Sequence, residues 1–185
     1  MRRTVTLAAG ALTLGALAVV ARRLARLEPV LVEGDSMRPT LLPGQRLAVG
    51  PLDRPPRRGD LVVVRRAPTQ PTPVGLEVVK RVVGLPGERV RLVAGRLEVD
   101  GVEVAEPYLG ATAGGEAGDL DLRLGEDQYL VLGDHRAAST DGRDFGPVPA
   151  ADLTGRVRFA YWPPRRLPDP ARMPRSVPIR PTGGR

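Results

Sequence analysis

The sequence has no cysteine, one histidine and one lysine, and aromatic residues make up 3% of its 185 positions. The absence of cysteine excludes disulfides, thiolate nucleophiles and metal sites with cysteine ligands. A catalytic zinc site needs about three protein ligands, usually with histidine among them, so a single histidine argues against a zinc hydrolase. We therefore do not expect a zinc site.

Positive charge is concentrated at the two ends of the chain. The net charge is +7, of which residues 1–28 carry +4 and residues 163–185 carry +5, so the residues between them are slightly acidic. Phosphate binding requires a basic groove on the folded body, and this distribution does not indicate one. We therefore expect no nucleic-acid partner.

An uncharged, apolar stretch of 18 residues, 4–21, lies between arginine pairs near the N-terminus. This is about the minimum length that crosses the hydrocarbon core of a bilayer. It predicts one N-terminal transmembrane helix, which makes residues 1–28 a membrane anchor. A cleaved signal peptide is the alternative, because Ala16-Leu17-Ala18 has the small-residue spacing of a cleavage site. Arginines flank both ends, so charge alone does not give the orientation of the stretch.

Residues 29–162 contain short apolar runs with period-two alternation, which is typical of β-strands. Ala94-Gly95 and Asp100-Gly101 interrupt one run and predict tight hairpin turns. Residues 110–119 are small and Gly-rich and predict a flexible surface loop. The Pro/Arg-rich residues 163–185 predict a disordered tail. The expected runs are 29–34, 45–50, 60–66, 76–84, 89–104, 128–134 and 155–162.

Lys80 is the one lysine among 28 basic residues. Arginine stays protonated in proteins, whereas a desolvated lysine can lose its proton near neutral pH and act as a base. Strand alternation places Lys80 on one face with Val78 and Val82, and Arg81 on the other face. Lys80 is therefore a candidate general base; a snorkelling or ion-paired lysine is the alternative.

Ser36 lies in the segment Gly34-Asp35-Ser36-Met37-Arg38-Pro39, directly after a predicted strand. A sharp turn bounded by glycine and proline exposes the hydroxyl, and nearby N–H groups can point at a developing oxyanion. Gly34, Asp35 and Met37 are the candidate oxyanion and turn residues. The alternative is a serine that caps the N-terminus of a helix.

A third polar cluster follows the sequence Gly133-Asp134-His135-Arg136. Ser139 is either a turn residue or a hydroxyl that orients the lysine. Asp134, Asp141 and Arg143 predict a salt-linked scaffold rather than acid/base catalysts. His135 is the only histidine that a Ser/His/Asp triad could use, and its place in a tight turn favours a polar surface role.

Together these segments resemble the type I signal peptidase family of serine proteases. The blocks that carry the resemblance are residues 34–41, 80–87 and 133–146, with a weaker block at 58–64, and the match spans about residues 30–162. Separate blocks in the right order agree by chance far less often than one short motif does.

The resemblance implies a Ser/Lys dyad, with Ser36 as nucleophile and Lys80 as general base. It also implies that Ser139 hydrogen-bonds the lysine and that the turn with Asp134, Asp141 and Arg143 braces the site. The implied fold is a mainly β, antiparallel and barrel-like domain on the outer face of a bacterial membrane. The implied substrates are exported preproteins, cut after small residues at the first and third positions before the bond, and the resemblance implies no metal or cofactor. We expect the substrate to add as an extended strand beside residues 30–35 and the Lys80 strand, because both have an edge-like placement.

Two positions depart from the family pattern. Gly34 stands where some members have a serine that helps to hold the oxyanion, and Gly142 stands where many members have a serine. Two other functions stay open on the sequence. One is a maturation peptidase of the same superfamily that acts on one precursor's N-terminal extension. The other is a non-catalytic, membrane-tethered β-domain that binds peptides.

Overall fold

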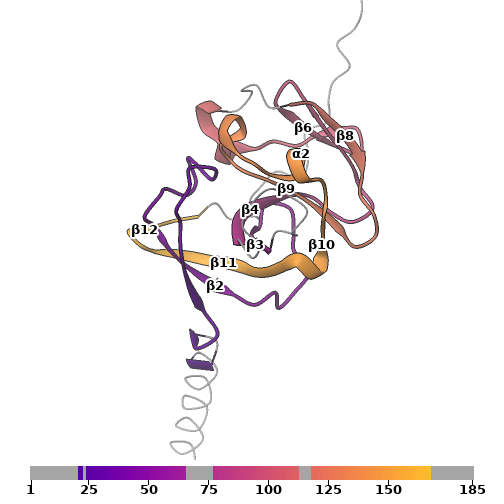
Figure 1. Ribbon diagram of the computed structural model, residues 1–185. Coiled ribbons are helices and arrows are strands. Elements are labelled where there is room, and N and C mark those ends of the chain that lie inside the picture. Colours follow the sequence, from indigo (N-terminus) through magenta and orange to yellow (C-terminus); the bar gives the residue numbers. More distant parts are fainter. Residues whose placement is uncertain (1–20, 23, 66–76, 113–117, 168–185) are drawn as a thin grey trace, which may run out of the picture.

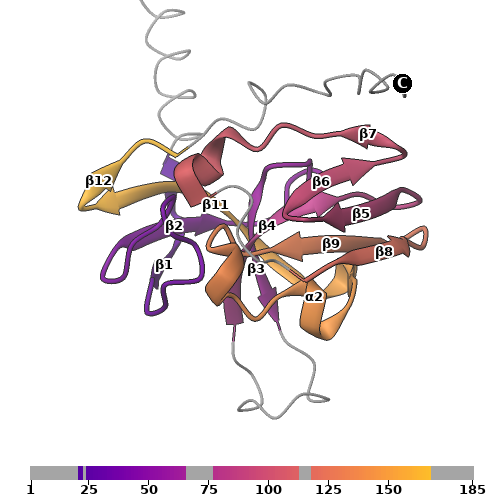
Figure 2. The ribbon, with the colours of Figure 1, turned by 90° about the horizontal axis from the view of Figure 1, so that it is seen from above.

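The computed structural model describes residues 21–22, 24–65, 77–112 and 118–167, which form two antiparallel β-sheets (Figures 1 and 2). The prediction of a mainly β, antiparallel domain is therefore confirmed. All the strand runs expected from period-two alternation contain strands in the structure. Burial alternates along β5 (Arg89–Val93) and β6 (Arg96–Val99) of the smaller sheet, whereas the central strands β3 (Leu61–Arg65) and β9 (Gln128–Leu132) of the larger sheet are buried on both faces, which their continuous apolar runs indicate.

The larger sheet contains eight strands and curls into a half-barrel (Figure 1). The ends of its strand order are β1 and β10, so within the described residues it is not closed as a full barrel. Its strands in order are β1 (Glu28–Leu31), β2 (Arg46–Gly50), β11 (Leu153–Trp162), β3 (Leu61–Arg65), β4 (Glu77–Gly84), β9 (Gln128–Leu132) and β10 (Val148–Pro149). The short strand β12 (Pro164–Arg165) pairs with β11.

The smaller sheet has the order β7 (Val102–Glu103), β6 (Arg96–Val99), β5 (Arg89–Val93) and β8 (Leu120–Arg123). Its two hairpins turn at the predicted positions. Ala94 and Gly95 have φ angles of 47° and 76°, and Asp100 and Gly101 have φ angles of 50° and 79°. Positive φ at both central residues matches the right-handed twist of hairpin strands, which confirms the two predicted turns.

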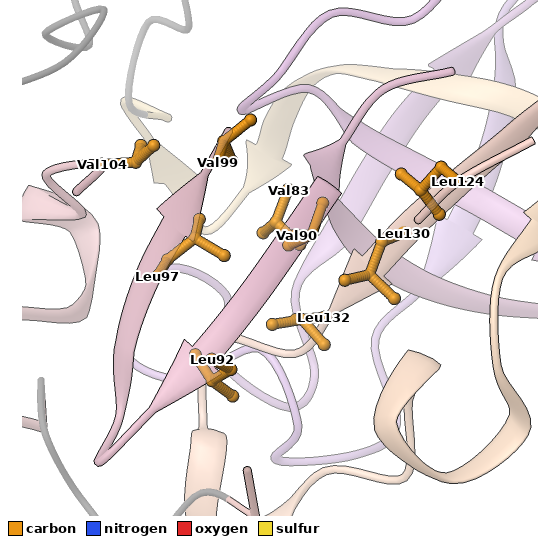
Figure 3. Packing of buried hydrophobic residues seen from close by; sticks show 9 residues of the cluster. All are labelled: Val83, Val90, Leu92, Leu97, Val99, Val104, Leu124, Leu130 and Leu132. Carbon is orange, nitrogen blue, oxygen red and sulfur yellow. The ribbon is translucent and has the colours of Figure 1, made fainter. Parts of the chain in front are cut away.

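A buried apolar cluster joins the smaller sheet to β4 and β9 of the larger one (Figure 3). Each Val or Leu in it contributes roughly 1.5–3 kcal/mol through burial. A Cβ added at Gly84 would lie 2.7 Å from both Leu124 and Val90, so the sheets approach closely at the end of β4. The end of the strand that carries Lys80 is thus packed against the smaller sheet. The cluster consists of Val83, Val90, Leu92, Leu97, Val99, Val104, Leu124, Leu130 and Leu132.

Short helical turns connect the strands: η1 (Pro107–Thr112), η2 (Arg136–Ala138), α2 (Gly142–Phe145) and η3 (Ala150–Asp152). The flexible loop predicted for residues 110–119 is partly wrong, because its first three residues belong to η1. Residues 113–117 of that loop lie outside the described residues.

The ends of the chain were predicted to be an anchor and a disordered tail. The predicted span lies almost wholly outside the described residues, and within them no helix is long and apolar enough to cross a membrane. At the other end, residues 168–185 also lie outside the described part. The tail's first residues are ordered, since Pro164–Arg165 form β12 and Leu167 packs against the core cluster that contains Met37.

Candidate active site

Ser36 lies in an isolated turn after β1. The N–H of Arg38 donates to the Asp35 carbonyl at 3.0 Å, and the N–H of Leu41 donates to the Met37 carbonyl at 2.8 Å. Met37 and Leu41 are buried in the core, with 2% and 0% of their surface exposed. No helix forms at residues 36–41, so the alternative that Ser36 caps a helix is wrong. The core anchors the turn and leaves Ser36 half-buried.

Two of the turn's predicted site residues, Gly34 and Asp35, are exposed. The Asp35 carboxylate accepts a hydrogen bond from Nε of Arg38 at 2.5 Å, and both of these side chains are more than half exposed. An ion pair in water contributes little to stability. Asp35 and Arg38 therefore shape the turn locally, whereas Met37 fixes it to the core.

Lys80 lies in the middle of β4, opposite Val62 of β3, and only 3% of its surface is exposed. Its Nζ donates a hydrogen bond to Oγ of Ser36 at 2.7 Å. The structure thus brings together the two side chains that the sequence singled out as nucleophile and base. They are 44 residues apart in the chain. This pair is the centre of the candidate site.

Arg81, the neighbour of Lys80, is fully buried on the other face of β4. Its Nε and Nη2 donate to the two carboxylate oxygens of Asp134 at 2.8 and 2.6 Å, and its Nη1 donates to the Gly59 carbonyl at 2.8 Å. Its guanidinium also lies 3.8 Å from the ring centroid of Tyr108. A bidentate pair of this kind is geometrically specific. Arg81 therefore fixes the strand that carries Lys80 to the turn after β9.

The turn after β9 also holds Ser36. The backbone N–H of His135 donates to the Ser36 carbonyl at 3.0 Å, and Nη2 of Arg81 reaches Oγ1 of Thr40 at 3.2 Å. One network therefore positions both members of the Ser36/Lys80 pair. The surface role expected for His135 is wrong, because the residue is half-buried and its Nδ1 is buried without a hydrogen-bond partner among the described residues.

A second buried ion pair supports the same turn. Arg136 donates to the carboxylate of Glu106 from Nη1 at 3.0 Å and from Nη2 at 2.5 Å, and its Nε donates to the Gly133 carbonyl at 3.1 Å. The hydroxyl of Tyr108 donates to the same carboxylate. Burial raises the pKa of Tyr108 well above its usual value, and the charge of Glu106 raises it further. Tyr108 therefore stays neutral beside Arg81.

Asp141 and Arg143 form the ion pair that the sequence suggested. Arg143 donates to the Asp141 carboxylate from Nε at 2.8 Å and from Nη2 at 2.9 Å, and the Gly133 N–H donates to it at 2.8 Å. Burial by itself raises the pKa of Asp141. The hydrogen bonds from Arg143 and Gly133 outweigh that effect, so the pKa lies below its usual value. Asp141 also caps α2.

The hydrogen bond expected between Ser139 and Lys80 does not form. Oγ of Ser139 is buried without a hydrogen-bond partner among the described residues. It lies close enough to the Asp141 carboxylate to favour its ionised form, but not in the geometry of a hydrogen bond. The side chain instead packs against Gly133, where an added Cβ would overlap it. The family resemblance therefore placed Ser139 correctly near the Ser36 turn, but the hydrogen bond to Lys80 that it implied is absent.

Two glycines permit the close packing around the site. A Cβ at Gly133 would lie 2.6 Å from the Ser36 carbonyl oxygen, so the turn after β9 can approach the nucleophile only without a side chain there. A Cβ at Gly142 would lie 2.7 Å from Cδ1 of Leu130 and 2.8 Å from the Val131 carbonyl oxygen. A side chain at Gly142 would therefore require β9 to shift in this chain.

Four residues of the buried network around the site were not predicted from the sequence: Arg81, Tyr108, Glu106 and Arg136. One signal was available for Arg81, because it lies within a run of valines in a predicted strand. A charged residue at such a position requires a buried partner. No group of three or more His, Asp or Glu in the described part of the chain is arranged to hold a metal ion.

Replacing Asp134 with asparagine is expected to destabilise the domain by about 3–5 kcal/mol, because Arg81 keeps its charge in a buried site without a counter-ion. Chemical denaturation at neutral pH measures this loss. Asp121→Asn is the matched control, since Asp121 pairs with Arg89 on the exposed face of the smaller sheet. The control should change stability far less. Equal losses in the two variants would contradict the scaffold role of Asp134.

Asp141 should make stability depend on pH in the acidic range. Its pKa in the folded protein lies below that in the unfolded chain, so the stabilisation is present above the unfolded value of about 3.9 and is lost as pH falls through the folded value. Denaturant titrations at pH 7 and pH 3 measure the free energy of unfolding. Between these two pH values it should fall more for wild type than for Asp141→Asn. An equal fall in wild type and variant would mean that the pKa of Asp141 is the same in the folded and unfolded chains, which would contradict the prediction.

The family model and the curated relatives indicate the same family. The family model described as "Signal peptidase, peptidase S26" matches residues 4–162. A signal peptidase I from Leptolyngbya laminosa is 37% identical over 142 residues, covering 74% of this chain and 69% of that protein. Signal peptidase I T from Bacillus subtilis is 34% identical over 154 residues, covering 74% of each. A crystal structure of a signal peptidase I from Enterococcus faecalis is 31% identical, covers 56% of this chain and 97% of its own, and superposes with a TM-score of 0.48.

The family model matches most of the chain, and curated relatives exceed 30% identity over about three quarters of it. The chain therefore belongs to the signal peptidase family, peptidase S26, and is a serine endopeptidase of that family.

Proposed function

We propose that the chain is a membrane-anchored peptidase that removes signal peptides from exported preproteins, with Ser36 as nucleophile and Lys80 as general base. One observation carries the proposal: the amine of a lysine that is 3% exposed lies 2.7 Å from the Ser36 hydroxyl. Removal from water favours the neutral form of an amine. The pair is therefore in hydrogen-bonding reach and in an environment suited to proton transfer.

The reaction follows from this contact. The neutral Lys80 amine accepts the proton of the Ser36 hydroxyl while Oγ attacks the scissile carbonyl, which gives an acyl-enzyme and releases one fragment. Lys80 gives this proton to the amine of the leaving fragment and becomes neutral again. It then takes a proton from water while the water oxygen attacks the acyl-enzyme carbonyl, and it returns that proton to Oγ of Ser36 as the second fragment leaves. Arg81 and the turn after β9 hold the lysine and the serine in register for both steps, because one network contacts both segments.

The oxyanion is stabilised by backbone. The N–H of Ser36 makes no hydrogen bond to any described residue, so it is available to a substrate. Gly34 has no hydroxyl to add to it, and the Ser36 N–H therefore supplies more of the stabilisation in this chain. An N–H donor preorganised at the developing charge is worth several kcal/mol in acyl transfer.

The substrate binds as an extended strand. β9 pairs with β4 only from Arg81 onward, so residues 77–79 lack a strand partner on that side among the described residues. β1 is the last strand in the order of the larger sheet, and of the described strands it pairs only with β2. Both free edges lie at segments next to the Ser36/Lys80 pair, and strand addition supplies main-chain hydrogen bonds to an extended peptide.

Exposed apolar side chains support attachment to a membrane. Leu31, Phe159 and Trp162 are 53%, 44% and 64% exposed. They lie on neighbouring strands, where Leu31 and Trp162 both pair with Arg46 of β2. Aromatic and apolar side chains beside arginine are typical of the interface between lipid and water. In this proposal residues 1–28 anchor the chain by a single span, and the β domain faces the extracytoplasmic side of a bacterial membrane.

Incubation with a panel of preproteins, followed by mass spectrometry of the products, tests the function. We expect one cut in each of several preproteins, after small residues at the first and third positions before the bond. Cleavage of a single precursor only would favour the dedicated maturation peptidase. No cleavage of any member by the detergent-solubilised full chain would contradict the proposal and favour a peptide-binding domain.

A further inference from the structure

A groove lies where the chain enters the β domain, between residues 24–27 and the start of the segment that follows β2. Its volume is about 400 Å³. One part of its lining is apolar and consists of Leu24, Leu27 and Phe159, and the other is charged and contains Arg26, Arg158 and Asp53. The Ser36/Lys80 pair does not line it. The groove therefore combines a surface for hydrocarbon with donors for an anion.

The charged part has an excess of positive charge. Nη2 of Arg158 donates to the Pro51 carbonyl at 2.6 Å and lies 3.1 Å from Asp53, whose carboxylate also accepts from Nη2 of Arg156 at 2.7 Å. The hydrogen bond from Arg158, more than any other contact, lowers the pKa of Asp53, so this carboxylate is ionised and already shared by two arginines. Arg26 has no ion pair or hydrogen bond to any described residue.

The backbone of β2 is shaped to hold this arrangement. A Cβ added at Gly50 would lie 2.7 Å from Nε of Arg158 and 3.1 Å from Cδ2 of Leu27. Arg158 and Leu27 therefore lie directly against the strand at the one position without a side chain. This contact places a guanidinium and an apolar side chain next to each other on the wall of the groove.

The groove follows closely on the apolar stretch of residues 4–21. The N–H of Ala25 donates to the Ala21 carbonyl at 2.9 Å, so the described chain leads from a helical turn directly into the groove. If residues 4–21 cross the bilayer as proposed above, Arg26 and Arg158 lie at the level of the lipid headgroups. Arginine is well suited to bind phosphate there, because its planar guanidinium donates to two oxygens at once.

We propose that this groove binds an anionic phospholipid, with Arg26 and Arg158 on the phosphate and with Leu24, Leu27 and Phe159 against the first carbons of the acyl chains. The inference rests on the membrane attachment in the proposed function but not on the peptidase chemistry. Asp53 is occupied by two arginines, so it offers little to the cationic headgroup of a zwitterionic lipid. The site therefore selects for negative charge.

Native mass spectrometry of the full chain in neutral detergent tests the proposal. The probes are short-chain phosphatidylglycerol, phosphatidylcholine with the same chains, and inorganic phosphate. Phosphatidylglycerol should bind about tenfold more tightly than phosphatidylcholine, since each arginine near an anionic headgroup contributes a several-fold gain. The double variant Arg26→Gln/Arg158→Gln should lose that preference. The double variant Arg96→Gln/Arg123→Gln, which removes two exposed arginines from the smaller sheet, should keep it.

Arg26→Gln alone guards against misfolding, because Arg26 has no partner to lose within the described residues; it should still reduce the preference about fivefold. Equal binding of the two lipids, or wild-type binding by the double variant, would overturn the proposal. Displacement of phosphatidylglycerol by equimolar inorganic phosphate would assign the groove to a free anion instead. Peptide cleavage in lipid-free detergent should be unchanged in the arginine variants, and the binding assay does not depend on cleavage.

Discussion

A Lys80→Arg variant is expected to lose peptidase activity by on the order of 10⁴-fold in kcat/KM, because the guanidinium cannot give up its proton and cannot act as a base. The positive charge and the long aliphatic stem are retained, so the loss is specific to proton transfer. Cleavage of a preprotein or a signal-peptide analogue by equal amounts of folded wild type and variant measures it. Wild-type turnover in this variant would contradict the role of Lys80.

Two further variants separate chemistry from folding. A permanent charge at a position that is 3% exposed can destabilise the domain, so Lys80→Met serves as a neutral variant of similar length. It should keep a cooperative thermal unfolding transition and be as inactive as Lys80→Arg. Arg46→Lys at the exposed first residue of β2 is the matched control, because it exchanges the same two residue types in the opposite direction. It should cleave like wild type.

A Ser36→Ala variant is expected to lose at least about 10⁴-fold in kcat/KM, since removal of the nucleophile abolishes the acyl-enzyme route. Ser36 is half-buried, and its side chain makes one hydrogen bond within the described part of the chain, to Lys80, so the free energy of unfolding should fall by only about 1 kcal/mol. A serine-reactive acyl probe, located by peptide mapping, should label Ser36 in wild type and nothing in the variant.

Thr140→Ala is the matched control for the serine variant, because it removes an exposed hydroxyl from the turn after β9, which contacts the Ser36 backbone. Its cleavage rate and labelling should equal those of wild type. If Ser36→Ala cleaves at the wild-type rate, or if the probe labels a different residue in wild type, Ser36 is not the nucleophile.

Most of the strands and both hairpins of the smaller sheet could be predicted from local sequence patterns. Period-two alternation located the long strands, and the Ala94-Gly95 and Asp100-Gly101 pairs located the hairpins. The strands it missed, β8, β10 and β12, have two to four residues, which is too short for alternation to be distinct. The open edge of the half-barrel depends on which strands pair at the ends of the sheet, and no local pattern records that.

Site residues could be predicted where their residue type is rare in this chain and suited to a particular reaction. Lys80 stood out because arginine occupies every other basic position, and the family resemblance joined it to Ser36. Arg81 did not stand out, since arginine is common in this chain and its partner Asp134 lies 53 residues away. For Ser139, resemblance supplied a contact that the packing against Gly133 replaces. Contacts set by tertiary packing were therefore the ones missed.

The most direct test of the account is an NMR titration of the Lys80 amine in the folded wild-type protein labelled at the lysine side chain. The chain has one lysine, so a single side-chain signal reports the state of the proposed base without assignment. We predict a titration midpoint well below the usual lysine pKa of about 10.4, and a shift of that midpoint in Ser36→Ala. A midpoint at about 10.4 in the folded protein would show that the amine is protonated at neutral pH and would contradict its role as the base.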